Sequence, residues 1–358
     1  MASDHYDAYR PEDAYEGRPP GSEPVAEGGP EAAPGTPLRW HDLSREQRAV
    51  LDRRSWNRAI VFFLLTLLST FWVGSGMVTV DAAQPAGLLD GWIFAVPLLA
   101  ILLCHEFGHY IFARRHGVAT SPPYFIPFPN LIGTMGAFIS IRSPIHNRRQ
   151  LLDIGAAGPL AGFVPSVIVL VIGYSLSTVT PLSSLPQGEP LIVLGDSLLT
   201  RFIQEMVMGP VPDGYDVMIH PVGLAGWVGL FVTMLNLLPV WMLDGGHVTY
   251  ALLGRGQWRL APLAMLGVIL VGVFVESWWL HILGAWAFLY LVFVVVARLF
   301  RRSGPSLRDL MSGRFLRHFP VPNEEPVGPV RSAIGWLCVG ILVLCFIPAP
   351  IRIMVVGG

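Results

Sequence analysis

The chain has 358 residues, of which 53% are hydrophobic and only 14% are charged. Soluble proteins carry roughly 25% charged residues, so the deficit excludes an ordinary soluble domain and favours a protein that crosses a membrane several times. The formal net charge is −1. Because this leaves no strongly basic surface, a nucleic-acid partner is not expected.

The chain begins with a region rich in proline, glycine, alanine and acids. It has too few apolar side chains to offset the entropy of ordering, so we expect residues 1–36 to be a disordered cytosolic tail. The polar juxtamembrane segment at 37–58 is expected to form a helix on the membrane surface, which Asp42 or Ser44 could cap. No cleavable signal peptide is expected, because the first long apolar run begins only near Ala59.

Seven apolar stretches follow, each near the ~20 residues that a helix needs to cross a bilayer. They form an integral membrane domain at 59–349, with its core at 92–254, and a short tail at 350–358 ends the chain. The predicted fold class is an all-α polytopic membrane protein with about six or seven transmembrane helices. The stretches are 59–80, 92–113, 151–178, 221–243, 260–276, 279–298 and 333–349.

The distribution of arginine indicates the orientation of these spans, because cytosolic loops of membrane proteins carry an excess of basic residues. Arginines cluster before the first and third spans and after the second, fourth and sixth. The loops near 81–91 and 179–220 carry many acids and only one arginine, Arg201. The N-terminus is therefore expected on the cytosolic side.

Two of the connecting loops have distinct patterns. The stretch at 117–147 is apolar, but five prolines and three glycines interrupt it, so it cannot form a spanning helix. We expect a re-entrant loop or hairpin beside the second helix. The longest outward loop is 180–220, and Leu191–Met208 within it is expected to form an amphipathic surface helix.

The second apolar span contains the pattern H-E-x-x-H, at residues 105–109. On a helix, His105 and His109 project from one face and can share a zinc ion, while Glu106 stands beside the metal and can take a proton from water. Ionisable groups at membrane depth are costly and mark function. The pattern therefore predicts a metalloprotease that works within the membrane, with one zinc ion in each chain.

A catalytic zinc usually takes three protein ligands and leaves one position for water. We expect Asp244 to be the third ligand. His105 lies nine residues before Arg114, and Asp244 lies eleven before Arg255, so on helices that run in the same direction they reach a similar depth. An acid at the C-terminal end of the fourth helix would oppose the helix dipole, and a bound cation would remove this conflict.

Other interpretations of the same residues stay open. The glutamate and the histidines could form a buried polar cluster that only holds helices together. A non-enzymatic metal-binding protein or metal transporter could use the same ligands, and so could a catalytically inactive scaffold. Transporters tend to carry further acidic or histidine sites and internal repeats, neither of which is visible in this sequence.

The remaining histidines and the cysteines are weaker candidates. His247 could lie beside the metal or the substrate, or be structural. His116 and His146 are expected on the surface, and His220 is expected to start a helix far from the metal. The three cysteines lie in apolar runs and cannot make a disulfide scaffold, so we expect buried, inert thiols at Cys104, Cys338 and Cys345.

Taken together, these motifs resemble the site-2 protease family of intramembrane zinc metalloproteases. The resemblance rests on HEFGH at 105–109, NLLPVWMLDGGH at 236–247, GTMGAFI at 133–139 and AAGPLAG at 156–162. The run HPVGLAGWVGL at 220–230 is similar to the branch from archaea, bacteria and plant chloroplasts that lacks a PDZ domain. Val240-Trp241-Met242 departs from the family, whose members often carry polar or small residues there.

The resemblance implies roles for individual residues. It makes Glu106 the catalytic glutamate and implies zinc ligands at His105, His109 and Asp244. It implies that Asn236 lies near the substrate backbone. A further set matches a loop that pairs with the substrate as an extended strand: Gly133, Thr134, Met135 and Gly136.

The resemblance also implies the reaction and its setting. The expected substrate is another membrane protein, cleaved in or near one of its transmembrane segments. The expected location is the lipid bilayer of a bacterial inner membrane, where this chain is a multi-pass protein.

Overall fold

The computed structural model describes residues 45–77, 87–185, 188, 190–240, 243–285, 287 and 321–355. The expected N-terminal tail at 1–36, the candidate caps Asp42 and Ser44, and most of the sixth predicted span at 279–298 lie outside the described residues.

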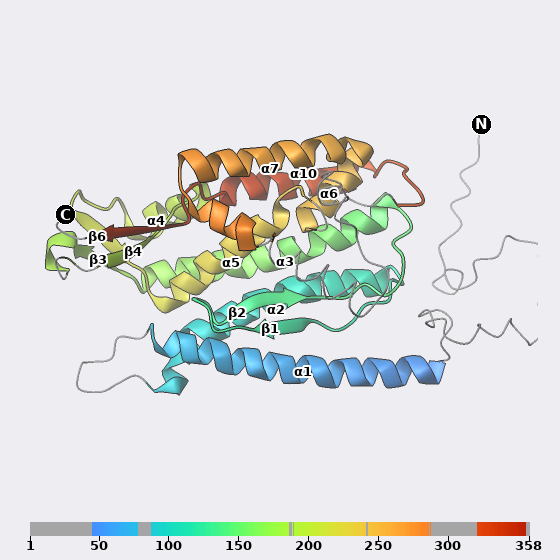
Figure 1. Ribbon diagram of the computed structural model, residues 1–358, viewed down its shortest axis with the longest axis horizontal. Helices are drawn as coiled ribbons and strands as arrows, with labels where there is room; N and C mark the ends of the chain where they lie inside the picture. The colour runs from blue at the N-terminus through green and yellow to red at the C-terminus, as the bar shows by residue number, and fades with distance from the viewer. Residues whose placement is uncertain are drawn as a thin grey trace, which may run out of the picture.

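The first helix is longer than the sequence pattern suggested. Helix α1 runs without a break over Arg45–Ser75, a length of 31 residues, and forms a single rod along the bottom of Figure 1. The helix expected within 37–58 is therefore present from Arg45 onward as the first part of α1, and its position at the membrane surface stays a prediction. No glycine or proline occurs in the helix before Gly74, so nothing in the chain separates a surface helix from a spanning one.

Three helices form the centre of the bundle: α2 (Trp92–Arg115), α3 (Arg148–Ser175) and α5 (Pro221–Leu237). A short 3-10 turn, η2 (Leu88–Gly91), leads into α2. Helix α3 lies between the other two and also contacts the later helices. The core between them is built from fully buried aliphatic side chains, including Leu98, Leu152, Leu170, Leu230 and Met234.

Glycines bring α3 and α5 unusually close together. A Cβ atom on Gly173 would lie 2.0 Å from the Cα atom of Gly223. A Cβ atom on Gly226 would lie 2.5 Å from the backbone nitrogen of Leu170. Small residues of this kind let helix backbones pack directly in a membrane, where van der Waals contact drives helix association.

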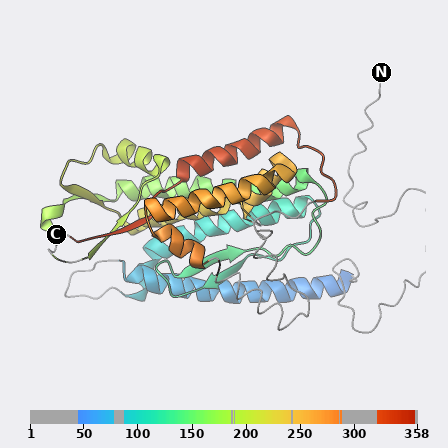
Figure 2. The same ribbon diagram turned by 45° about the horizontal axis from the view of Figure 1, so that its top comes forward.

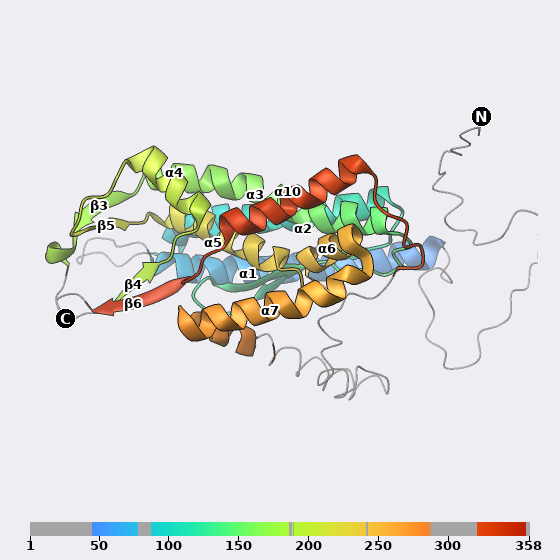
Figure 3. The same cartoon turned by 90° about the horizontal axis from the view of Figure 1, so that it is seen from above.

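The fourth predicted span, 221–243, is interrupted. Helix α5 ends at Leu237, and after six intervening residues the chain begins a new helix, α6 (Asp244–Leu253). Helix α6 ends at Gly254, and after the short 3-10 turn η4 (Gly254–Gly256) helix α7 (Gln257–Phe274) returns along the bundle. Figure 3 shows α6 between α7 and the last helix, α10 (Pro329–Cys345).

Four stretches are long and apolar enough to cross a membrane: Val50–Ser75, Leu88–Arg115, Arg148–Ser175 and Asp244–Phe274. The apolar helices α5 and α10 are shorter. The fourth stretch combines α6 and α7, which reverse direction at η4, so length alone does not count the spans. The described chain is that of a mainly helical, polytopic membrane protein, and the expected count of six or seven spans stays a prediction.

The interrupted apolar stretch at 117–147 forms a β-hairpin, so of the two expected forms the hairpin is confirmed. Strands β1 (Tyr124–Pro127) and β2 (Thr134–Phe138) pair antiparallel and pack against α1 (Figure 1). Phe125 is buried, and its ring meets that of Phe63 edge to face with centroids 5.1 Å apart. The expected all-α class was therefore too narrow.

A small cap of strands and one helix covers one end of the bundle, at the left of Figure 2. Strand β3 (Thr178–Pro181) forms an antiparallel pair with β5 (Tyr215–Met218). Strand β4 (Pro190–Leu194) pairs with β6 (Ile351–Val355), so much of the expected tail at 350–358 is a strand. A short 3-10 turn, η3 (Leu182–Ser184), follows β3.

The helix expected over Leu191–Met208 is only partly confirmed. Helix α4 covers Leu198–Met208, whereas 191–194 belong to strand β4. The side chain of Ser197 accepts a hydrogen bond from the backbone nitrogen of Thr200 at 3.1 Å and so caps the start of α4. The strand before this cap finds its partner more than 150 residues away, which a local pattern could not reveal.

We expect Gly226→Leu to lower the free energy of unfolding by about 2–3 kcal/mol, because the added side chain must push α5 away from α3. Unfolding in SDS, followed by far-UV circular dichroism, measures this difference. Gly267→Leu on α7 is the matched control, since no heavy atom lies within 4 Å of a Cβ atom there. Equal stability of the two variants would contradict the close α3–α5 contact.

Candidate metal centre

Helix α2 carries three of the predicted site residues into the bundle. His105, Glu106 and His109 are 4%, 6% and 7% exposed. The buried residues Leu98 and Leu102 precede the two histidines at the same three- and four-residue spacing. One face of the helix is therefore apolar at its start and carries ligand side chains toward its end.

Helix α6 brings the fourth residue to the same point. Asp244 is its first residue, and its carboxylate Oδ2 and Oδ1 atoms lie 3.2 Å from Nε2 of His105 and 3.2 Å from Nε2 of His109, respectively. The two Nε2 atoms are also 3.2 Å apart. Among the described residues, these three form the one cluster of histidine, cysteine and acidic side chains that could hold a metal ion.

The spacing of the donor atoms fits zinc. With Zn–N and Zn–O bonds of ~2.0–2.2 Å, tetrahedral geometry places neighbouring donors about 3.3–3.5 Å apart. Two imidazoles and one carboxylate are also the donor set of many catalytic zinc sites, which keep a fourth position for water. His105, His109 and Asp244 could therefore bind one zinc ion with little movement.

The position of Asp244 corrects one argument from the sequence. We had expected an acid at the C-terminal end of the fourth helix, in conflict with the helix dipole. The acid is instead at the N-terminus of α6, where the dipole favours a negative charge. A Cβ atom on Gly245 would lie 1.9 Å from the carbonyl oxygen of Leu237, so this glycine lets α6 begin directly against the end of α5.

Residues of helix α3 contact both histidines. Nδ1 of His109 lies 2.8 Å from the carbonyl oxygen of Ile154, so Nδ1–H donates there and Nε2 is free to bind a metal. Gly158 lies against the same ring, because a Cβ atom there would be 2.0 Å from Nε2 of His109. A Cβ atom on Gly162 would be 3.0 Å from Cβ of His105.

Asn236 belongs to the same centre. Its Nδ2 atom lies 3.3 Å from Nε2 of His105, close to the atom that would bind the metal. Asn236 is on the last turn of α5, just before the break that leads to Asp244. Its amide therefore lies at the same point as the ligand atoms.

The four residues expected to contact substrate lie on the β1–β2 hairpin and not among the ligands. Gly133 has φ = +77°, and a Cβ atom there would lie 2.6 Å from Cα of Thr70 on α1. Thr134 is buried, and its hydroxyl donates to the carbonyl oxygen of Ile126 at 2.9 Å. Met135 is exposed, and Gly136 has φ = +98°.

The other histidines differ in their surroundings. His247 is half-buried against α3, where a Cβ atom on Gly155 would lie 2.8 Å from its own Cβ atom. His116 was expected to be a plain surface residue, but its Nε2 atom lies 2.9 Å from Oδ2 of Asp153 in a partly buried pair. His146 is exposed and His220 precedes α5, as expected.

The cysteines follow the expectation in two cases out of three. Cys338 and Cys345 are buried on α10, but Cys104 is exposed. Neighbours on a helix point about 100° apart, so Cys104 faces away from the bundle when His105 faces into it. It is not part of the metal centre.

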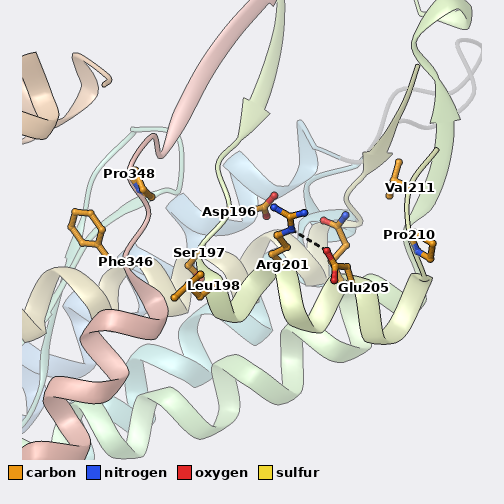
Figure 4. A pocket seen from close by; sticks show the side chains of 10 residues that line it. Asp196, Ser197, Leu198, Arg201, Glu205, Pro210, Val211, Phe346 and Pro348 are labelled. Atoms are coloured by element: carbon orange, nitrogen blue, oxygen red, sulfur yellow. Dashed lines mark hydrogen bonds and ion pairs between the residues drawn. The ribbon is translucent and has the colours of Figure 1, made fainter. Parts of the chain in front are cut away.

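The structure also shows a cavity of about 490 Å³ in the terminal cap (Figure 4). Its lining includes Asp196 just before α4, Arg201 and Glu205 on α4, and Phe346 and Pro348 after α10. None of the residues that line it belongs to the metal centre, so we assign it no part in the chemistry there.

The sequence was compared with known proteins. The sequence model of Peptidase family M50 matches residues 93–275. The chain is 36% identical to the probable zinc metalloprotease EGY1, chloroplastic, of Arabidopsis thaliana over 209 residues, which cover 57% of this chain and 36% of that protein. It is 34% identical to the probable zinc metalloprotease EGY2, chloroplastic, of Oryza sativa subsp. indica over 169 residues, which cover 47% and 30%. The chain thus spans about a third of the length of these relatives.

We expect Gly158→Ala to weaken zinc binding by about 10- to 100-fold, the cost typical of disturbing the groups that orient a metal ligand. The new methyl group would displace the ring of His109 and break its hydrogen bond to Ile154. Competition with a chelator of known affinity measures the loss. Gly340→Ala on α10, where a Cβ atom meets nothing within 4 Å, should bind zinc like the wild type.

Proposed function

Because this chain belongs to Peptidase family M50, we propose that it is a zinc metalloprotease that hydrolyses a peptide bond in or near a transmembrane segment of a partner protein. One observation carries the proposal. The Nε2 atoms of His105 and His109 lie 3.2 Å apart and each is 3.2 Å from one carboxylate oxygen of Asp244, beside Glu106 inside an apolar bundle. Ionisable groups at membrane depth are costly to bury, so their presence there indicates a function.

Bound zinc would supply a Lewis acid that polarises the scissile carbonyl and lowers the pKa of a coordinated water toward ~7. Glu106 acts as the general base and takes one proton from the attacking water. The hydroxyl oxygen then bonds to the carbonyl carbon and the C–N bond breaks. Glu106 returns the proton to the leaving amine. The backbone of Ile154 keeps the ring of His109 in one orientation throughout.

We propose that Asn236 and the β1–β2 hairpin bind the substrate. Asn236 supports this role because its amide lies next to His105 and can donate to a carbonyl of the substrate backbone. Strand β2 pairs with β1 on one side, and a substrate could add along the other edge as a further strand. Strand addition suits the reaction, since a helical segment must unwind before its scissile carbonyl can be reached.

The rival functions are less well supported. A metal transporter needs a series of sites along its path, but within the described part of the chain only one cluster has the composition of a metal site. A catalytically inactive scaffold would not need a buried glutamate beside the ligands, and Glu106 is present.

We also propose that the chain is a multi-pass protein of a bacterial inner membrane with a cytosolic N-terminus. The arrangement of charge supports this orientation. Arg148 donates to the carbonyl oxygens of residues 251, 252 and 324, and Arg255 pairs with the carboxylate of Glu324. Both arginines therefore lie at the same end of the bundle. The acids Asp213 and Asp216 lie in the cap, at the end where α3 finishes.

Glu106→Gln should lower the rate of cleavage of a membrane-protein reporter by about 10²- to 10⁴-fold, because the amide cannot accept the proton of water. Zinc binding should persist, since the two histidines and Asp244 remain. Cleavage is measured in proteoliposomes, with zinc content measured on the same sample.

Glu205→Gln is the matched control, because Glu205 is exposed on α4 and pairs with Arg201 far from the ligands. It should cleave like the wild type. Near wild-type cleavage by Glu106→Gln would refute the proposed chemistry. Zinc flux across the vesicle membrane that Glu106→Gln leaves unchanged would favour a transporter.

The orientation can be tested by labelling in intact cells. In a background without native cysteines, Asp213→Cys in the cap should react with a membrane-impermeant maleimide added outside. Arg115→Cys, at the end of α2, should react only after the cells are opened. The reverse pattern would show that the N-terminus lies outside.

A further inference from the structure

Arg148 is a buried arginine at the start of α3, with 8% of its surface exposed. Its Nε and Nη2 atoms donate to the carbonyl oxygens of Ala251 and Leu252 at 2.8 and 2.7 Å. Its Nη1 atom donates to the carbonyl oxygen of Glu324 at 3.1 Å. A buried guanidinium is costly unless it is hydrogen-bonded, and each of the three nitrogens of Arg148 donates to a carbonyl oxygen.

The first two acceptors are the end of α6. Ala251 and Leu252 belong to its last turn, where carbonyl groups have no partner within the helix and a positive charge is favoured by the dipole. Gly254 ends the helix with φ = +57°, and a Cβ atom there would lie 3.4 Å from Nη1 of Arg148. The positive φ favours glycine at this position, and the guanidinium of Arg148 lies next to the point where the helix ends.

The other end of α6 carries a metal ligand. The helix has ten residues and is about 15 Å long, and Asp244 is the first of them. A helix this short moves as a rigid unit, so a shift or rotation at Leu252 is transmitted to Asp244. Between the two ends, His247 packs on Gly155 of α3.

Helix α3 is therefore in contact with both sources of ligands. Ile154 and Gly158 orient His109 on α2, whereas Arg148 and Gly155 hold α6. One helix thus sets the distance between the histidines and the aspartate.

We infer that Arg148 is a positioning residue for Asp244. By binding the carbonyl groups at the C-terminus of α6, it holds the carboxylate of Asp244 at 3.2 Å from Nε2 of His105 and His109. This inference deepens the proposed function and rests on it, since it concerns the same zinc site.

The experiment compares purified full-length wild type, Arg148→Gln, Arg148→Lys and Arg149→Gln in nanodiscs. Zinc affinity is measured by chelator competition, and the visible absorption of Co²⁺ bound in place of zinc reports the geometry of the ligands. We expect Arg148→Gln to lose about 10- to 100-fold in zinc affinity and to change the Co²⁺ spectrum. Arg148→Lys should recover part of both, because it keeps the charge but cannot donate to two carbonyl groups in the same fork.

Arg149→Gln is the matched control, because it removes the same charge from the next residue of α3 and should behave like the wild type. Wild-type zinc affinity and Co²⁺ spectrum in Arg148→Gln would overturn the inference, even if that variant were less stable to heat. If Arg148→Gln does not fold, Arg148→Lys decides in the same way, with a weakened affinity expected and an unchanged one contradicting the role. Failure of the wild type to bind zinc would refute the proposed function itself.

Discussion

The constraint on which the rest of the structure depends is the burial of a carboxylate and two imidazoles at one point of an apolar bundle. Groups of this kind are stable away from water only when they are paired or bind a metal. Asp244 comes from one helix and His105 and His109 from another, and the aspartate follows the histidines by more than 130 residues of sequence. Both helices must therefore reach the same depth and keep the same distance, which limits how the bundle can be assembled.

Two features of the chain meet this demand. Small residues on α3 allow α2 to pack so closely that a backbone carbonyl, that of Ile154, reaches Nδ1 of His109. The break between α5 and α6 places Asp244 at a helix N-terminus, with Asn236 on the turn before it. A continuous helix would have left the carboxylate to compete with unpaired carbonyl groups, so the break is part of the site.

The cap at the opposite end has a different character. It joins the connection between α3 and α5 to strand β6 through the pairing of β4 with β6. The indole of Trp227 on α5 also donates to the carbonyl oxygen of Gly195 at 2.8 Å. This ties α5, which carries Asn236, to the segment between β4 and α4. The ligand end and the cap end of the bundle are therefore linked through α5 as well as through α3.

Features that depend on local spacing could be predicted from the sequence. Two histidines four residues apart must share a helix face, an apolar run of about 20 residues predicts a span, and five prolines in 117–147 exclude a helix there. Similar distances from the arginines that follow them, nine and eleven residues, also predicted Asp244 at about the depth of His105. Tertiary structure alone decided that Asp244 begins a helix, that Arg148 and Ile154 hold the ligand-bearing helices, and that β4 pairs with β6. These contacts use backbone carbonyl groups or join residues far apart in the chain, and neither kind leaves a periodic signal in the sequence.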